Sequence, residues 1–306
     1  MHKLLIFMIL IMSNLVADYL IVDDAPIGSV SNNIVVNNMR KEFSPNSLGL
    51  GVNSVVEQLP IYIKSDSSQN ISMVLSGLNK LKNSTDQEEI ESSFFYRTVE
   101  GHEVAIQEGV PFILSRTMNH REGNSIAGYI IIKAMNISSM QTVGLYWLDA
   151  NIQVALDNRL SRLAQLSVSG SVPLVAVAGF NDNSEVLSGQ KFYDESVNYG
   201  KFKFGQENII MKELFVKSNS LKSFKISFAA SDLIHKTYPE HRIKMNYFYA
   251  AKNQAEQAIT NNYFTAITGK NDGTQVGQMI FKTEAIKNTQ LAGEYQANIN
   301  ITITLE

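Results

Sequence analysis

Gly128-Tyr-Ile-Ile-Ile-Lys133, followed by Gln141-Thr-Val-Gly144-Leu-Tyr146, recurs 149 residues later as Gly277-Gln-Met-Ile-Phe-Lys282 and Gln290-Leu-Ala-Gly293-Glu-Tyr295. Glycine, lysine, glutamine, glycine and tyrosine match without a gap. Each copy then continues into a segment with an apolar residue at every second position, namely Ile152, Val154 and Leu156 in the first copy and Ile299, Ile301, Ile303 and Leu305 in the second. Such alternation is typical of a half-buried strand. The repeat therefore predicts two tandem copies of one β domain.

Weaker echoes extend the repeat toward the N-terminus with an offset of 153 residues. Ile61-Tyr-Ile-Lys-Ser65 is echoed by Leu214-Phe-Val-Lys-Ser218, and Phe94-Phe-Tyr96 by Tyr247-Phe-Tyr249. Short runs of Val, Ile, Tyr, Phe and Thr alternate with clusters of Asn, Ser, Gly and Asp through most of the chain, which is typical of β-sandwiches. We predict an all-β protein made of two tandem immunoglobulin-like β-sandwiches.

The N-terminus has the pattern of an export signal. Two basic residues, His2 and Lys3, precede an apolar run, and Leu15-Val16-Ala17 offers a cleavage site before Asp18. The alternative is a buried N-terminal helix or strand. The apolar run is too short for a permanent membrane anchor, so we expect an exported protein that is not membrane-embedded. The predicted division is a signal peptide over 1–17, an N-terminal domain over 18–157 and a C-terminal domain over 158–306. The stretch 158–176 is a linker and donor-like segment.

Composition excludes several classes of protein. The chain has no cysteine, which removes disulfide scaffolds, thiol nucleophiles and cysteine-ligated metals. The net charge is −3 overall. Residues 18–157 hold 9 Lys and Arg against 16 Asp and Glu, a net of −7, and residues 158–306 hold 16 against 13, a net of +3. This asymmetry is too mild to indicate nucleic acid as a partner.

The last predicted strand carries the main functional hypothesis. Apolar residues at 299, 301, 303 and 305 alternate with polar ones, so one face should pack on a core and the other should meet water. If this is the penultimate strand of an immunoglobulin-like sandwich, the last strand is missing. A hydrophobic groove would then be open to a strand from another chain. Its candidate residues are Tyr295, Ile299, Ile301, Ile303 and Leu305. The alternative is a complete sandwich whose last strand is C-terminal.

Two segments resemble known proteins. Ala292-Gly-Glu-Tyr295 and the alternating strand after it resemble the C-termini of pilin subunits assembled by the chaperone–usher pathway. Leu166-Ser-Val-Ser-Gly-Ser-Val172, which leads into Pro173, is similar to the start of such a pilin. Without cysteine, the chain resembles the alternate (class 5, colonisation-factor-like) group of these subunits. The match covers mainly 166–178 and 277–305.

The resemblance implies a fimbrial tip adhesin or minor pilin subunit, assembled by donor-strand exchange, with its second domain an incomplete pilin-type sandwich. It implies a periplasmic chaperone, an outer-membrane usher and a major pilin subunit as partners, a position at the fimbrium tip on the cell surface, and attachment to host cells, with a host-cell glycoconjugate as a possible ligand. The N-terminal 18–24 shows no long alternation. The alternating Leu166, Val168 and Val172 could instead complete the first domain in cis. Alternatives are a purely structural fimbrial initiator and a free-standing secreted carbohydrate-binding or hydrolytic β protein.

Signals for catalysis are weak, and we expect no enzyme, no metal site and no cofactor. The histidines form no metal-ligand motif, and no Gly-x-Ser-x-Gly elbow occurs. The candidate receptor-binding residues are Arg116, His120 and Arg121 in one predicted loop, with Arg97 as a weaker fourth, because arginine presents a fork suited to carboxylates such as that of sialic acid. The alternative is an ordinary polar loop. We interpret Trp147, the only tryptophan, as a core residue, with sugar stacking as the alternative.

Overall fold

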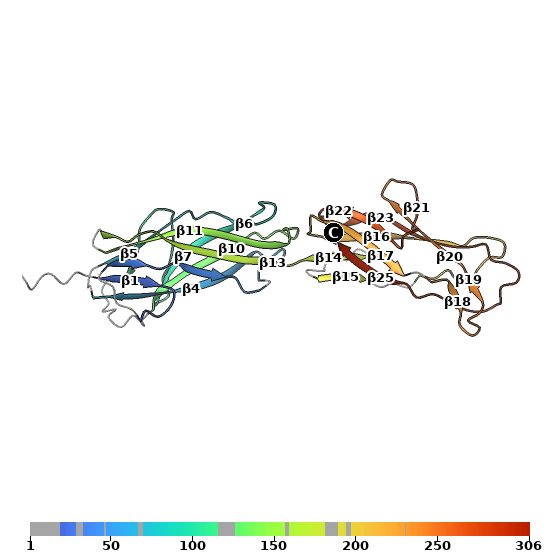
Figure 1. Cartoon of the computed structure of the whole chain (residues 1–306), viewed down its shortest axis with the longest axis horizontal. Helices are drawn as coiled ribbons and strands as arrows, with labels where there is room; N and C mark the ends of the chain where they lie inside the picture. Colours follow the sequence, from blue (N-terminus) through green and yellow to red (C-terminus); the bar gives the residue numbers. More distant parts are fainter. Residues whose placement is uncertain are drawn as a thin grey trace, which may run out of the picture. The chain divides into compact units, whose positions relative to one another are not determined.

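The computed structural model (Figure 1) describes residues 19–28, 33–45, 47–66, 70–115, 126–156, 159–180, 189–193, 197–229 and 231–306. All regular secondary structure in these ranges is β-strand, which confirms the all-β prediction. Within the same ranges no helix has the length and apolarity needed to cross a membrane. The expected signal at 1–17 and the loop residues Arg116, His120 and Arg121 lie outside the described residues.

The chain folds into two compact units. The first reaches Ser171, apart from two short loops, and the second runs from Val172 to Glu306, so the donor-like alternation falls within the first unit except for its last residue, Val172. The strands of the first unit are β1 (Leu20–Asp23), β2 (Ile34–Val36), β3 (Met39–Glu42), β4 (Ser54–Ser65), β5 (Ile71–Ser76), β6 (Leu81–Asn83), β7 (Glu89–Thr98), β8 (Glu103–Ala105), β9 (Phe112–Ser115), β10 (Ile126–Met135), β11 (Gly144–Leu156), β12 (Arg159–Leu160) and β13 (Ala164–Val172).

The first unit is a continuous ladder in the order β2-β1-β4-β10-β7-β6-β11-β13-β3, with β5, β8, β9 and β12 attached at its sides. Its buried residues alternate along β5 and β11, as a half-buried strand requires. Tyr96 of β7 contacts Phe112 of β9 with ring centroids 5.2 Å apart, so the two parts of the ladder face each other across the core. The core is apolar and holds almost the whole inward face of β11.

The second unit contains β14 (Val175–Gly179), β15 (Gly189–Tyr193), β16 (Ile209–Ser218), β17 (Ser223–Ala229), β18 (Leu233–His235), β19 (Arg242–Ile243), β20 (Met245–Ala251), β21 (Gln257–Ala258), β22 (Tyr263–Thr268), β23 (Asn271–Thr283), β24 (Tyr295–Gln296) and β25 (Asn300–Leu305). They form three sheets, with the orders β15-β14-β16-β23-β20-β21, β22-β17-β25 and β19-β18-β24. Aromatic and aliphatic side chains from all three sheets share one core.

The two units repeat the same strand pairings in the same register. In the first unit β10 pairs with β4 and β7, and in the second β23 pairs with β16 and β20. Gly128 lies opposite Ile61, and Gly277 lies opposite Leu214. Likewise β11 pairs with β5, and β25 pairs with β17. The sequence repeat is therefore a structural repeat.

Each repeat glycine makes room for a buried tyrosine. Tyr96 Oη lies 2.8 Å from the carbonyl oxygens of both Leu114 and Ala127, which share its single proton, and burial raises the pKa of its hydroxyl. A Cβ on Gly128 would lie 2.4 Å from that hydroxyl oxygen and 2.6 Å from the Arg97 carbonyl. These distances leave no space for any side chain at position 128.

The second unit repeats this arrangement. Tyr249 Oη donates to Val276 O at 3.2 Å, and a Cβ on Gly277 would lie 2.9 Å from the same hydroxyl. The glycine of the repeat therefore keeps a tyrosine hydroxyl inside each sandwich.

The repeat lysine is held on the outer face in the same way in both units. Lys133 Nζ lies 3.9 Å from the ring centroid of Phe95 and 2.8 Å from Glu103 Oε1. Lys282 Nζ lies 4.5 Å from the ring centroid of Phe248 and 2.5 Å from a Glu256 carboxylate oxygen. The hydrogen bond from Lys133, and then that from Arg97, lowers the pKa of Glu103. A cation over an aromatic ring, fixed by a carboxylate, favours one rotamer for the lysine.

We expect Gly128→Ala to destabilise the first unit by roughly 1–3 kcal/mol, because the new methyl group overpacks against Tyr96 and against backbone. Urea unfolding measures the loss. Gly28→Ala is the matched control, since a Cβ at Gly28 meets nothing within 4 Å. Equal stability of the two variants would contradict the close contact between tyrosine and glycine.

Candidate partner-binding groove

In the first unit, β13 lies beside β11 in the same sheet. After β11 the chain turns back, with Leu160 paired to Ala155 and the Ser161 N–H donating to Val154 O at 2.9 Å. It then enters β13, which lies between β11 and β3 in the sheet order. β13 runs parallel to β3, with Leu166 opposite Met39. β13 thus fills the position between two strands that come from distant parts of the sequence.

The inward residues of β13 and β11 are sealed from solvent. Leu166, Val168 and Val172 are 0%, 1% and 2% exposed, and Leu148, Ala150 and Ile152 on β11 are 3%, 1% and 0% exposed. Gly170 allows the closest approach, because a Cβ there would lie 2.8 Å from Leu48 Cδ1. The alternating apolar residues Leu166, Val168 and Val172 are therefore all buried.

The counterpart of β11 in the second unit is interrupted and partly open. The 13-residue strand β11 corresponds to two short strands, β24 and β25, with Ala297–Ile299 between them. β25 is the terminal strand of its sheet among the described residues. Ala297, Ile299 and Ile301 correspond to the sealed Leu148, Ala150 and Ile152, yet all three are partly exposed.

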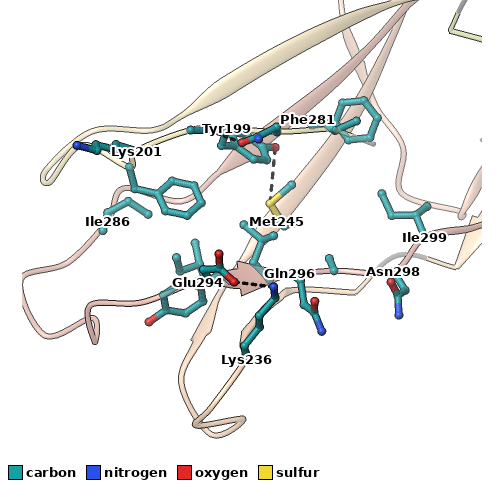
Figure 2. Close-up of a pocket in the computed structure, with 18 of the residues that line it drawn as sticks. Tyr199, Lys201, Lys236, Met245, Phe281, Ile286, Glu294, Gln296, Asn298 and Ile299 are labelled. Atoms are coloured by element: carbon teal, nitrogen blue, oxygen red, sulfur yellow. Dashed lines mark hydrogen bonds and ion pairs between the residues drawn. The ribbon is translucent and has the colours of Figure 1, made fainter. Parts of the chain in front are cut away.

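An elongated groove lies next to this interrupted strand. Its volume is about 1240 Å³, which is larger than the pockets that usually hold small molecules. One wall is the segment 197–204, the other is the segment 290–301, and the floor comes from β19, β20 and β23. Figure 2 shows Tyr199 and Lys201 on one side, Glu294, Gln296, Asn298 and Ile299 on the other, and Met245 between them. β14 and β15 also approach β25, and the lining ends at Ile301.

The lining is mainly aromatic and aliphatic. Phe281 packs edge-on against Tyr247, with centroids 6.0 Å apart, and Tyr199 Oη lies 3.8 Å from Met245 Sδ (Figure 2). Tyr247 Oη donates to Ser231 O at 2.9 Å, and burial raises its pKa to about 12, so this hydroxyl remains a neutral donor at physiological pH. The groove floor is therefore apolar with its few polar atoms already bonded.

One end of the groove is braced by aromatic and polar contacts. Tyr295 lies edge-on to Phe202 of the opposite wall at 6.4 Å and to His235 at 5.0 Å. His235 Nδ1 accepts the N–H groups of Thr237 and Tyr238 at 3.1 Å each, and Nε2 lies 3.2 Å from Ala292 O. This geometry fits a neutral ring that donates from Nε2. His235 thereby holds the wall segment that contains Tyr295.

The rim carries charge. Lys236 Nζ lies 2.5 Å from a Glu294 oxygen (Figure 2), and this hydrogen bond lowers the pKa of Glu294. Lys201 extends from the opposite wall and is exposed. An entering chain would meet polar side chains at the rim and apolar ones below. This pattern suits a strand with alternating side chains.

The structure places the residues predicted to form the groove in two environments. Tyr295, Ile299 and Ile301 line the groove. Ile303 is 6% exposed and pairs with Ile226 of β17, and Leu305 pairs with Phe224 of β17. These two residues lie beyond the lining.

Arg97 on β7 forms an ion pair with Glu103. Its guanidinium lies 2.8 Å from Glu103 Oε2, and the other oxygen of that carboxylate contacts Lys133. Arg97 is thus part of the outer-face cluster around the repeat lysine. Arg116, His120 and Arg121 lie outside the described residues, so their predicted role stays a prediction.

Sequence reasoning missed the opposite wall and the floor. Tyr199, Phe202 and Phe204 follow one another in a stretch otherwise rich in Gly, Asn and Lys. Three aromatic residues in such a polar stretch were an available signal for a loop that packs on a hydrophobic surface. The floor residues Tyr247 and Phe281 were visible only as members of the repeat.

The described residues contain no group of three or more His, Cys, Asp or Glu side chains placed to hold a metal ion. The groove can bury apolar side chains of a partner, and it lies beside β25, an edge strand of its sheet among the described residues. These are the elements of binding by β-strand addition.

Known structures match the chain over most of its length. No protein-family model and no characterised sequence matches it. A chaperone–tip adhesin complex of CFA/I fimbriae matches with 10% identity, 88% of this chain, 96% of that chain and a TM-score of 0.35. The CupB6 tip adhesin from Pseudomonas aeruginosa matches with 11% identity, 86% and 89% coverage and a TM-score of 0.35. The CooA pilin subunit from enterotoxigenic Escherichia coli matches with 15% identity, 46% and 93% coverage and a TM-score of 0.33.

The chain is therefore similar to tip adhesins and a pilin of class 5 fimbriae, the group that its sequence resembles. A match of another kind, to a family 123 glycoside hydrolase from Clostridium perfringens, covers 45% of this chain and 23% of that chain with a TM-score of 0.25.

Cysteine labelling tests the difference between the two units, because the chain has no cysteine of its own. We expect Ile301→Cys to react with a thiol reagent roughly 100-fold faster than Ile152→Cys, which occupies the same place in the first unit and must wait for local unfolding. The measurement is the rate of labelling of the folded chain. Similar rates would show that the groove is closed in solution.

Proposed function

We propose that this chain is the tip subunit of a bacterial fimbria, assembled by donor-strand exchange and used for attachment to host cells. In this proposal the second unit is an incomplete immunoglobulin-like sandwich, and its groove accepts a strand from another subunit. One observation carries it. The two units share their pairings, but β13 lies beside β11 in the first, and a groove lies at the corresponding place in the second.

The physical gain from filling the groove is large. A strand with about four inward apolar side chains would gain roughly 1.5–3 kcal/mol for each one it buries. Ordering the strand and losing its free motion offset part of that gain. Main-chain hydrogen bonds to the two walls would add affinity, and alternate side chains would set the register. β13 supplies the template, since its inward residues Leu166, Val168 and Val172 do this for the first unit.

The partners follow from the sequence resemblance. An open groove of this kind is an aggregation hazard while the subunit is unassembled. A periplasmic chaperone would fill it first, the outer-membrane usher would receive the complex, and the N-terminal strand of the major pilin would replace the chaperone. The chain would then stand at the fimbrium tip on the cell surface.

The position at the tip is supported by where the chain's own strands are used. β1 already pairs with β4 and β2, and Leu20, Ile21 and Val22 on it are buried. β13 is used within the first unit. Neither segment is available as a donor to a neighbouring subunit. A subunit that accepts a strand and offers none ends a fibre.

The donor strand is testable without knowing the partner. We expect a copy of Ala164–Val172, fused after Glu306 through a short turn linker, to raise the midpoint of one thermal transition by roughly 10 °C or more, because it buries several apolar side chains. The N-terminal segment of the major subunit should do the same. Calorimetry of the full chain without residues 1–17 is the measurement.

Two control variants sharpen this experiment. A fused segment with Asp at the positions of Leu166 and Val168 should give no rise, because a charge cannot enter an apolar groove without a penalty of several kcal/mol. Ile301→Asp in the groove should abolish the rise and block incorporation into fimbriae, whereas Thr302→Asp should not, because Thr302 is exposed and lies outside the lining. A midpoint unchanged by both unaltered donors would refute an incomplete second sandwich.

Attachment through the basic loop of the first unit is a separate prediction. We expect Arg116→Ala with Arg121→Ala to lower binding to host cells at least tenfold while the effect of donor-strand fusion stays the same, because arginine forks suit carboxylates on sialylated receptors. Flow cytometry of cells with bound protein measures this. Undiminished binding would remove the loop from the receptor site, and no binding by the unaltered chain would favour a purely structural tip subunit.

A further inference from the structure

Trp147 is not the core residue that the sequence suggested. It is 46% exposed and lies on the outward face of β11, between the buried Tyr146 and Leu148. The fold does not need an aromatic residue there, because the repeat has Gln296 at the corresponding position, 149 residues later. Trp147 is also the only tryptophan in the chain. Buried and exposed residues alternate along this part of β11, so packing does not explain a large aromatic ring on its exposed face.

The sheet face beside Trp147 is rich in hydrogen-bonding groups. Asp149 follows on the same face of β11, and its Oδ1 accepts a 2.6 Å hydrogen bond from Ser167 Oγ of β13. Ser167 lies opposite Arg40 of β3. A carboxylate, a hydroxyl and a guanidinium thus form a row across three neighbouring strands. Because a carboxylate has about four lone-pair sites, Asp149 retains acceptor capacity.

Charge on this face is balanced. Lys82 lies opposite Trp147 on β6, with its ammonium 3.6 Å from Glu89. Glu42 lies opposite Ser169, two residues beyond Arg40. Cations and carboxylates are therefore mixed, unlike the predicted basic loop with Arg116 and Arg121. A mixed face does not select for a charged ligand.

We propose that this face binds an uncharged oligosaccharide. A pyranose ring has one apolar face of C–H groups and a rim of hydroxyls. The indole of Trp147 offers a flat apolar surface for the first, and Asp149, Ser167 and Arg40 offer acceptors and donors for the second. Two residues along a strand and two strand spacings span about 7 Å by about 10 Å, which is room for one or two sugar rings. The site does not use the groove of the second unit, so either proposal can fail alone.

Because Trp147 is the only tryptophan, the tryptophan fluorescence of the chain reports on this site alone. Its fluorescence in the full chain without residues 1–17 should change saturably on titration with uncharged glycans that bind on a printed array of neutral and sialylated oligosaccharides. The matched variant is Trp147→Gln, which installs the residue of the repeat. We expect it to keep the thermal midpoint and to lose at least tenfold in array binding, while Trp147→Phe keeps part of it.

Leu160→Gln is the control for general loss of exposed apolar surface, since Leu160 is 59% exposed and lies apart from this row of residues on the short strand β12. It should bind as the unaltered chain does. Equal binding by Trp147→Gln would overturn the proposal, as would binding restricted to sialylated glycans. Absence of binding to any uncharged glycan by a folded chain would overturn it too, and would leave Trp147 as a contact for a protein partner.

Discussion

A strand with one apolar face and one open edge needs another strand beside it, and both units of this chain are organised around that need. In the first unit this strand is β11. β13 lies beside it in the sheet, and Leu166 on β13 and Ile152 on β11 are both 0% exposed. In the second unit the equivalent positions are split between β24 and β25 and are partly exposed. The main strand pairings are the same in both units, and the first unit has one further strand, β13, beside β11.

The shared features explain why the repeat is visible in the sequence at all. Gly128 and Gly277 cannot carry a side chain, because a tyrosine hydroxyl and a backbone carbonyl occupy the space. Lys133 and Lys282 each lie over a phenylalanine ring and contact a glutamate, Glu103 on β8 and Glu256 just before β21. Few residue types can occupy such closely packed positions or make both of these lysine contacts. Aliphatic core positions only need to fill volume, so they drift between the copies.

The sequence predicted the all-β fold from alternation and the repeat, because both are set by local geometry and by which face is buried. It also pointed to Leu166–Val172 and to the strand at 299–305 as a pair of unusual segments. It could not predict the opposite wall of the groove, since Phe202 meets Tyr295, and Tyr199 meets Met245, only through tertiary packing. Trp147 was misjudged for a related reason. A tryptophan next to a buried tyrosine suggests a core, and only the strand phase shows that it points outward.

The route of the chain through β13 has a mechanical consequence. β13 ends at Val172, where the longest stretch of the second unit begins, so tension along the chain at this junction would reach the first unit through β13. β13 is held on both edges, by β11 and by β3. Releasing it would uncover the apolar residues that it buries and expose two strand edges at once. The segment that completes the first unit is thus also its tether, and a force large enough to free it would destroy the fold that it completes.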